Sequence, residues 1–328
     1  MLINYLLVPL SSFMLGIFFI TILKKFSLKY KLLIPRGIPL IGGVGIGLTF
    51  ILGSLLIFFF YRSLSKEVVG IIISSSFMLI FGVIDDWHEL SVWAKFLVQI
   101  IATGLLILFG IRTQIIYMGN LINIIITFIW VLGITNAFNH LDIMDGVASG
   151  TAMIVSFAFF VIAVLNADMR TAILSLTLTG AIFGFFLYNF PPAKIYMGNA
   201  GSHFLGFVLA VIALIISYAP LGRKIALLSP LLILGLPIFD TTFLILIRLI
   251  KKNLPFKKSK DHLILRFLTL GYSKKKILFT MLGLSLFFCL CGILVSQVFS
   301  LLGIGIIAFA FFVSLLIANK MSKVAVND

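Results

Sequence analysis

Apolar stretches alternate with short polar segments along the whole chain. A helix needs about 20 residues to cross roughly 30 Å of hydrocarbon, and eleven stretches approach that length. They lie at about 2–23, 41–60, 68–84, 95–110, 121–138, 149–165, 171–190, 201–219, 225–248, 277–298 and 299–318. Several are short or run together, so the pattern supports about ten to twelve. It predicts an all-α, polytopic integral membrane protein with about eleven transmembrane helices.

Composition supports the membrane class. Hydrophobic residues make up 62% of the chain and charged residues 11%, and the mean hydropathy is +1.24, which excludes a soluble globule of average composition. The longest polar interruption, at about 249–276, leaves no room for a soluble domain, so residues 1–328 are expected to form a single integral-membrane domain. Residues 1–23 lack a preceding positive region and indicate a retained first helix, not a cleaved signal.

The basic residues predict an orientation. If the N-terminus faces outward, the inner segments carry 19 lysines and arginines and the outer segments carry six. The positive-inside rule therefore predicts an N-out, C-in topology. The same asymmetry accounts for the net charge of +15 and places a basic inner face against anionic headgroups or an anionic substrate. Nucleic-acid binding is disfavoured.

A pair of adjacent carboxylates, Asp85 and Asp86, ends the stretch 68–84 on the predicted inner side. Carboxylates at a helix C-terminus repel each other and are disfavoured by the helix dipole. A cation should compensate them, and either Mg²⁺ or Lys95 would serve. Ionisable groups gathered at one membrane face indicate substrate, ion or metal handling.

A second polar group follows the stretch 121–138. Asn139, Asp142 and Asp145 recur every three residues, and Asn136 precedes them, so a helix would place four oxygen-bearing side chains on one stripe. Such a stripe is typical of a hard-cation ligand set or a ribose-binding face.

Three other inner breaks add candidate residues. The segment 35–43, which carries Arg36, is rich in proline and glycine and is equally consistent with a helix-entry turn and a functional loop. At 196–203, small residues and Asn199 at a helix start would expose backbone N–H groups to a phosphate. The basic loop after Asp240 contributes His262 and Arg266.

The order of these motifs resembles one family, the polyprenyl-phosphate N-acetylhexosamine-1-phosphate transferases of glycosyltransferase family 4, which are related to phospho-N-acetylmuramoyl-pentapeptide transferase. The resemblance covers about residues 1–300 and is greatest for the undecaprenyl-phosphate GlcNAc-1-phosphate type, because a triple-histidine loop is absent. The motifs are PR…GG at 35–43, GVIDD at 82–86, NAFN…D…DG at 136–146, YMGNAGS at 196–202, PIFDT at 237–241 and DHL…R at 261–266.

The resemblance implies a reaction and its partners. Undecaprenyl phosphate in the inner leaflet would attack the β-phosphorus of a UDP-N-acetylhexosamine, with UDP-GlcNAc the expected donor, and release UMP. The product would be the first lipid-linked intermediate of a cell-envelope glycan such as the cell wall or lipopolysaccharide. The resemblance further implies a multi-pass protein of the bacterial inner membrane, with its active site on the cytoplasmic face and with Mg²⁺ as cofactor. Mn²⁺ could replace Mg²⁺, and a homodimer is compatible with the family.

The same resemblance assigns roles to individual residues. Asp85 and Asp86 would be the catalytic residues that organise the metal and the lipid phosphate, and Asn139, Asn199 and Asp86 would be metal ligands. The substrate-binding set divides into Asp142 and Asp145 on the nucleotide, Tyr196 stacked on uracil, Lys95, His262 and Arg266 on phosphates, and Arg36 and Asn136.

The chain departs from the family pattern at four positions. Asn199 replaces an aspartate of the usual Gly-Asp-x-Gly-Ser motif, and the other departures are His140, Ile143 and Leu265. These changes leave open a catalytically silent homologue that binds lipid phosphate or nucleotide. A secondary transporter is a second alternative, but it predicts repeated halves and broken or charged helices at the midplane. The hexosamine accepted, the polyprenyl length and the glycan pathway do not follow from the sequence.

Overall fold

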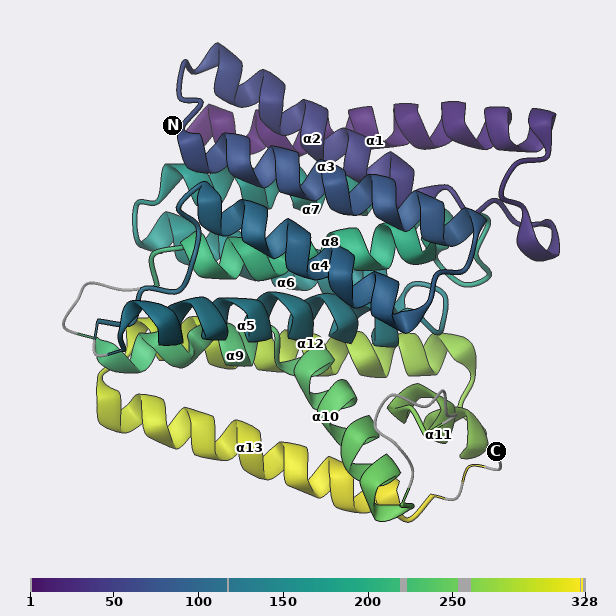
Figure 1. The fold of residues 1–328 in the computed structure, drawn as a ribbon. Helices are drawn as coiled ribbons and strands as arrows, with labels where there is room; N and C mark the ends of the chain where they lie inside the picture. The colour runs from purple at the N-terminus through teal and green to yellow at the C-terminus, as the bar shows by residue number, and fades with distance from the viewer. Residues whose placement is uncertain (1, 117, 219–222, 253–260, 325, 327–328) are drawn as a thin grey trace. The chain divides into compact units, whose positions relative to one another are not determined.

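The structure, a computed structural model, describes residues 2–116, 118–218, 223–252, 261–324 and 326. These residues form α-helices and two short 3-10 helices, and no strand occurs among them (Figure 1). The predicted all-α class is confirmed.

Packing divides the chain into two compact units, Met1–Ile216 and Ser217–Asp328. The single domain expected from the sequence stays a prediction. The first unit contains α1 (Leu2–Tyr30), η1 (Pro35–Gly37), α2 (Gly42–Phe60), α3 (Lys66–Trp87), α4 (Val92–Leu108), α5 (Asn120–Leu141), α6 (Val147–Leu165), α7 (Met169–Asn189) and α8 (Gly198–Ile215). The second contains η2 (Lys224–Leu228), α9 (Ser229–Ile233), α10 (Gly235–Ile250), α11 (Leu263–Thr269), α12 (Lys274–Gln297) and α13 (Ser300–Ser322).

Within the described residues, nine helices are long and apolar enough to cross a membrane, or ten if the bent pair Lys224–Ile233 and Gly235–Ile250 forms one span. Of the eleven predicted stretches, 95–110 is outside this count. It corresponds to α4, an apolar helix of 17 residues that is short for a crossing. A polytopic membrane protein is therefore confirmed. The N-out, C-in orientation stays a prediction.

The predicted stretch 225–248 is not one straight helix, because it bends by 69° at Leu234. Pro237 lacks an N–H for the carbonyl of Ile233, and a proline ring also crowds the carbonyl four residues earlier. The carbonyl of Ile233 instead accepts a hydrogen bond from the Cys289 thiol at 3.4 Å. Pro237 thus breaks the helix. The carbonyl of Ile233, which loses its partner in the helix, is satisfied by a residue of the neighbouring helix α12.

Helix α8 is the core of the first unit. Every residue from Ala200 to Ala213 is buried, and α8 packs against α2, α3, α5 and α6. Figure 1 shows these helices running alongside one another. Since the chain passes back and forth between the two ends of the unit, the end of α3, the end of α5 and the start of α8 meet on the same side. That side carries most of the residues in the sequence motifs.

Glycines allow the backbones to approach closely at the start of α8. A Cβ on Gly82 of α3 would lie 2.4 Å from Ala200 Cα, and a Cβ on Gly43 of α2 would lie 2.1 Å from Gly201 N. Both distances are far below van der Waals contact, so a side chain at either position would push α8 away. Gly43 and Gly82, each from one of the sequence motifs, therefore allow the start of α8 to lie close to α2 and to the end of α3.

The segment before α2 supports the segment before α8. The Tyr196 N–H donates to the Pro39 carbonyl at 2.9 Å, and the N–H groups of Gly42 and Gly43 donate to the carbonyls of Tyr196 and Met197 at 3.0 and 2.9 Å. Residues 35–43 do form an entry turn, with η1 preceding α2. The turn has an additional effect, because its backbone fixes the position of Tyr196.

We predict that Gly82→Ala destabilises the protein by about 1–3 kcal/mol, because the added methyl group must displace the backbone of α8. Thermal unfolding of the purified protein measures the change. Gly133→Ala in α5 is the matched control, since a Cβ there meets nothing within 4 Å and alanine favours a helix. Equal stability of Gly82→Ala and Gly133→Ala would show that α3 and α8 are not in close contact.

Candidate active site

Asp85 lies in the last turn of α3 and is 2% exposed. Lys95 Nζ, from the first turn of α4, lies 2.6 Å from Asp85 Oδ2, and the Leu90 N–H donates to Asp85 Oδ1 at 2.8 Å. A cation therefore compensates this carboxylate, and it is Lys95. The pair is largely buried, so removing either partner would leave an unpaired charge in a low-dielectric site.

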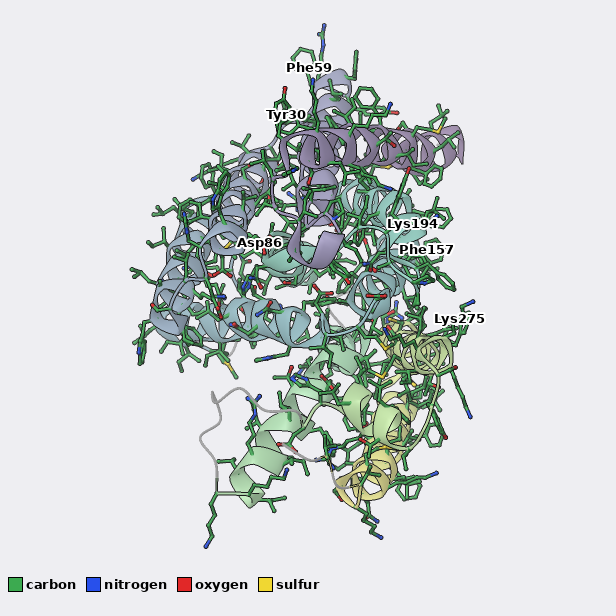
Figure 2. The ribbon with its side chains drawn as sticks, turned by 90° about the vertical axis from the view of Figure 1, so that its right-hand side faces the viewer. Tyr30, Phe59, Asp86, Phe157, Lys194 and Lys275 are labelled. Atoms are coloured by element: carbon green, nitrogen blue, oxygen red, sulfur yellow. The ribbon has the colours of Figure 1, made fainter. Side chains whose placement is uncertain are left out.

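Asp86 is compensated differently. Its two carboxylate oxygens accept the backbone N–H groups of Asn199, at 2.7 Å, and Ala200, at 3.0 Å, in the first turn of α8. A helix N-terminus favours an anion at this position because of its free N–H groups and its dipole. Gly198 is necessary here, because its φ is 74° and a Cβ would lie 2.5 Å from Asp86 Oδ2. In Figure 2 the Asp86 side chain lies toward the interior of the first unit.

This contact corrects one expectation. The sequence correctly predicted a helix that starts with small residues near Asn199, but it assigned the exposed N–H groups to a phosphate. In the structure Asp86 accepts two of them. A carboxylate contributed by α3 makes the same electrostatic interaction that a phosphate would make.

The stripe expected on one helix is also only partly correct. Helix α5 ends at Leu141, so Asn136 and Asn139 are helical, whereas Asp142 and Asp145 lie in the turn before α6. Gly146, with a φ of 78°, caps this turn in the left-handed region that favours glycine. The Asn139 side chain is held by α8, because Ser202 Oγ donates to Asn139 Oδ1 at 2.9 Å.

Asp142 has no described cation to compensate it. Although part of its surface is exposed, its pKa is raised to about 7, mainly by desolvation and also by the nearby carboxylates of Asp86 and Asp145. Asp145 is better stabilised, because its Oδ2 accepts the Ala193 N–H at 3.1 Å. We call Asp85, Asp86, Asp142 and Asp145 the carboxylate cluster.

One residue of the site is missing from the motifs read in the sequence. Asn189, at the end of α7, is 3% exposed. Its Oδ1 accepts the Gly146 N–H at 2.9 Å and the Ser149 hydroxyl at 2.8 Å, and its Nδ2 donates to the Ile195 carbonyl at 3.1 Å. It thus joins the turn of Asp145 to the segment that carries Tyr196. An asparagine that ends an apolar stretch just before Pro-Pro is the signal that could have identified it.

The remaining candidates of the first unit lie on neighbouring elements. Asn136, in α5, is hydrogen-bonded to Gln99 of α4. Tyr196 is half-buried and precedes α8. Arg36 lies in η1, and its side chain is outside the described part of the structure.

The second unit contains its own polar group. Asp240 of α10 is 1% exposed, and its Oδ1 accepts the Leu263 N–H at 3.2 Å while its Oδ2 lies 3.6 Å from His262 Nδ1. Arg266 is 2% exposed and donates to the Asp261 side chain and to the carbonyl of Met321 at 3.1 and 2.8 Å. Arg266 therefore stabilises the end of α13. The phosphate contacts of His262 and Arg266 stay predictions.

The donor atoms of the site suit a hard divalent cation. Asp86 and Asp142 provide carboxylate oxygens, and Asn139 and Asn199 can add amide oxygens, which Mg²⁺ and Mn²⁺ accept. The described residues contain no group of three or more His, Cys, Asp or Glu placed to hold a metal by themselves. A donor set of two carboxylates and two amides agrees with Mg²⁺ sites that use one or two carboxylates together with substrate phosphates. The metal assignment itself stays a prediction.

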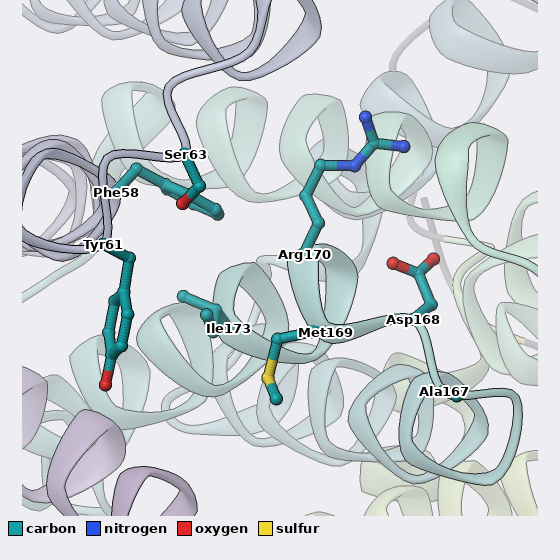
Figure 3. Close-up of a pocket in the computed structure, with 8 residues that line it drawn as sticks. All are labelled: Phe58, Tyr61, Ser63, Ala167, Asp168, Met169, Arg170 and Ile173. Carbon is teal, nitrogen blue, oxygen red and sulfur yellow. The ribbon is translucent and has the colours of Figure 1, made fainter. Parts of the chain in front are cut away.

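A separate pocket of about 640 Å³ lies at the other end of α2 and is lined by Phe58, Tyr61, Ser63, Ala167, Asp168, Met169, Arg170 and Ile173 (Figure 3). It adjoins the last residues of α2, whereas Gly42 and Gly43 at the start of α2 contact the Tyr196 segment. Helix α2 has 19 residues, so about 28 Å separates the two ends. The pocket is therefore not part of the candidate active site.

The fold and the site together define a class: a polytopic membrane protein whose carboxylates are concentrated where helix ends meet. Comparison with known proteins shows which family the chain is similar to. A model described as glycosyl transferase family 4 matches residues 68–217, which include the carboxylate cluster and the start of α8. The match covers just under half of the chain and agrees with the resemblance that its motifs indicated.

Three relatives illustrate the match. A probable undecaprenyl-phosphate N-acetylglucosaminyl 1-phosphate transferase of Bacillus subtilis is 31% identical over 217 residues, covering 64% of this chain and 60% of the relative. A decaprenyl-phosphate N-acetylglucosaminephosphotransferase of Mycolicibacterium smegmatis is 30% identical over 240 residues, with 65% and 59% covered. A phospho-N-acetylmuramoyl-pentapeptide-transferase of Streptococcus thermophilus is 32% identical over 204 residues, with 56% and 60% covered. The chain thus spans about 60% of the length of these relatives.

We predict that Asp142→Asn stabilises the metal-free protein, because it removes a buried charge that two carboxylates repel. The apparent melting temperature in EDTA should rise by about 2 °C or more. Asp85→Asn is the control and should lower it, since Lys95 would lose its counter-charge. A decrease for Asp142→Asn would mean that an undescribed cation compensates Asp142.

Proposed function

We propose that the protein transfers an N-acetylhexosamine 1-phosphate from a UDP-sugar to undecaprenyl phosphate, at the cytoplasmic face of a bacterial inner membrane. GlcNAc is the proposed hexosamine, because two of the relatives above are named for N-acetylglucosamine. The observation that carries the proposal is the carboxylate cluster, which lies where α3, α5 and α8 meet and falls within the region that matches the family.

The proposed reaction forms one phosphorus–oxygen bond and breaks another. An oxygen of the lipid phosphate attacks the β-phosphorus of the UDP-sugar, and UMP leaves with the electrons of the broken bond. A phosphate monoester has a second pKa near 6, so the attacking oxygen is already largely ionised at neutral pH. The protein therefore needs no strong general base, and positioning together with charge neutralisation should lower the barrier most.

The lipid phosphate would bind beside α3 and α4. Lys95 is the described cation nearest to Asp85, at 2.6 Å, and its ammonium group has further N–H donors for a phosphate oxygen. A divalent cation held by Asp86, Asn139 and Asn199 would neutralise the phosphates during transfer. The carboxylates would repel the phosphates without a cation, so the proposal requires one.

The nucleotide would bind beside the turn that follows α5. Asp142 and Asp145 can accept hydrogen bonds from ribose hydroxyls or from the uracil N–H, and Tyr196 offers an aromatic face to the base. Asn189 connects this turn to the Tyr196 segment, so the two parts of the proposed nucleotide site are fixed relative to each other.

A silent homologue that binds the lipid phosphate or the nucleotide is the second candidate. One observation favours it: Asn199 carries no charge where the family pattern has an aspartate. A secondary transporter has no comparable support.

Release of UMP by the purified protein tests the proposal. Full-length protein in detergent, given UDP-GlcNAc, undecaprenyl phosphate and Mg²⁺, should release UMP, and omission of the lipid or addition of EDTA should abolish it. Asp86→Asn should lower kcat by about 10²-fold or more, because it removes a charge from the site. Turnover that persists in EDTA would contradict the metal assignment, and absence of turnover in wild type would favour the silent homologue.

Asn199→Asp separates a weakened enzyme from a silent one. In a working enzyme the added carboxylate strengthens the metal shell, so less Mg²⁺ should give the half-maximal rate. In a silent homologue neither protein releases UMP, and the charge added beside Asp86 should only lower thermal stability. Full activity with unchanged Mg²⁺ dependence would contradict both, because position 199 would then not contact the ion.

A further inference from the structure

Gln99 is a polar residue that none of the motifs contains. It lies in α4 and is 0% exposed. Its Oε1 accepts a hydrogen bond from Asn136 Nδ2 at 2.7 Å, and its Nε2 lies 3.4 Å from Asn136 Oδ1. Two amides therefore face each other between α4 and α5. A buried amide is costly unless it is hydrogen-bonded, so each of these two amides needs the other as its partner.

The hydrogen bonds determine which way the Asn136 amide is turned. Its Nδ2 also donates to the carbonyl of Leu132, at 2.8 Å. A carbonyl oxygen can only accept, so the atom facing Leu132 must be the nitrogen and not the oxygen. Both N–H groups of the amide are then used within the protein. Asn136 Oδ1 receives only the long contact from Gln99 and keeps capacity to accept another hydrogen bond.

We infer that Gln99 is a positioning residue that holds Asn136 with its amide oxygen available to the donor substrate. The inference deepens the proposed function and rests on it. The substrate group that meets this oxygen must be a hydrogen-bond donor, such as a hydroxyl or N–H of the UDP-N-acetylhexosamine. A phosphate oxygen that is ionised at neutral pH does not fit, so Asn136 recognises the sugar or nucleoside part and not the diphosphate.

On α4, Lys95 lies beside the proposed lipid-phosphate site and Gln99 beside the proposed nucleotide site. Gln99 follows Lys95 by four residues, so both side chains lie on the same face of the helix. Lys95 contacts Asp85 of α3, on the proposed lipid-phosphate side, whereas Gln99 contacts Asn136 of α5, on the nucleotide side. A substitution at Gln99 should therefore affect the UDP-sugar and leave the lipid phosphate unaffected.

Binding and kinetics of full-length variants in detergent with Mg²⁺ test the inference. Gln99→Leu should raise both the Kd for UDP-GlcNAc, measured by calorimetry, and its KM by about tenfold. The KM for undecaprenyl phosphate should stay within about twofold. Asn136→Ala should weaken UDP-GlcNAc binding similarly, and the double variant should be no weaker than Asn136→Ala alone, because Gln99 acts through Asn136.

Thr103→Val is the matched control. Thr103 lies one turn further along α4, is 0% exposed and donates to the Gln99 backbone carbonyl at 2.7 Å. Valine keeps its shape, so the Kd for UDP-GlcNAc should not change. If Gln99→Leu does not fold, Gln99→Asn replaces it, since the shorter amide remains polar but cannot keep the 2.7 Å bond, and it should raise the Kd in the same direction.

The outcomes separate this inference from the proposed function. If wild type neither binds UDP-GlcNAc nor releases UMP, the proposed function is wrong and the inference fails with it. If wild type is active but the Gln99 variant binds UDP-GlcNAc as wild type does, only the inference is overturned. It is also overturned if the KM values of both substrates rise equally, or if the effects of Gln99→Leu and Asn136→Ala add in the double variant, because Gln99 would then have a general structural role.

Discussion

The contact of the Asp86 carboxylate with the start of α8 is the constraint on which the rest of the site depends. Two backbone N–H groups of α8 donate hydrogen bonds to this anion, which the C-terminal end of α3 would otherwise disfavour. The contact requires close helix packing, and therefore glycine at positions 82 and 198. It also places α8 where Ser202 can hold Asn139 of α5. One carboxylate thus organises the ends of three helices.

The carboxylates of the cluster differ in what balances their charge. Asp85 has Lys95, Asp86 has the helix N-terminus and Asp145 has a backbone N–H, whereas Asp142 meets mainly other carboxylates. The imbalance at Asp142 costs stability unless a cation or a donor-rich ligand binds there. Proteins commonly keep such unfavourable charges where a ligand is to be bound. The balanced carboxylates form the framework, and Asp142 is the position that a ligand would stabilise.

The sequence predicted the class, most helices and the residues that gather around α8, because apolar length and the spacing of polar residues are local properties. It named Lys95 as one possible counter-charge of the Asp85–Asp86 pair, but it did not predict the other pairings. Asp86 was expected near a metal, and its contact with Asn199 and Ala200 joins residues more than a hundred positions apart. The bend at Leu234 depends on Pro237, a local signal that the apolar pattern concealed. Gln99 was missed because a single amide inside an apolar stretch has no pattern. Asn189 has a local signal, but only tertiary structure shows its partners.

The departure at Asn199 changes the charge of the site but not its framework. The contact with Asp86 uses the backbone N–H of Asn199, which any residue except proline provides. An aspartate in this place would add a carboxylate to the same helix start, beside Asp86, and would raise both the repulsion without metal and the attraction for a cation. If position 199 contacts a metal, as proposed, the asparagine would weaken metal binding while stabilising the metal-free protein. Architecture and chemistry at this position are therefore separable: the backbone of residue 199 supports the fold, and its side chain sets the charge of the site.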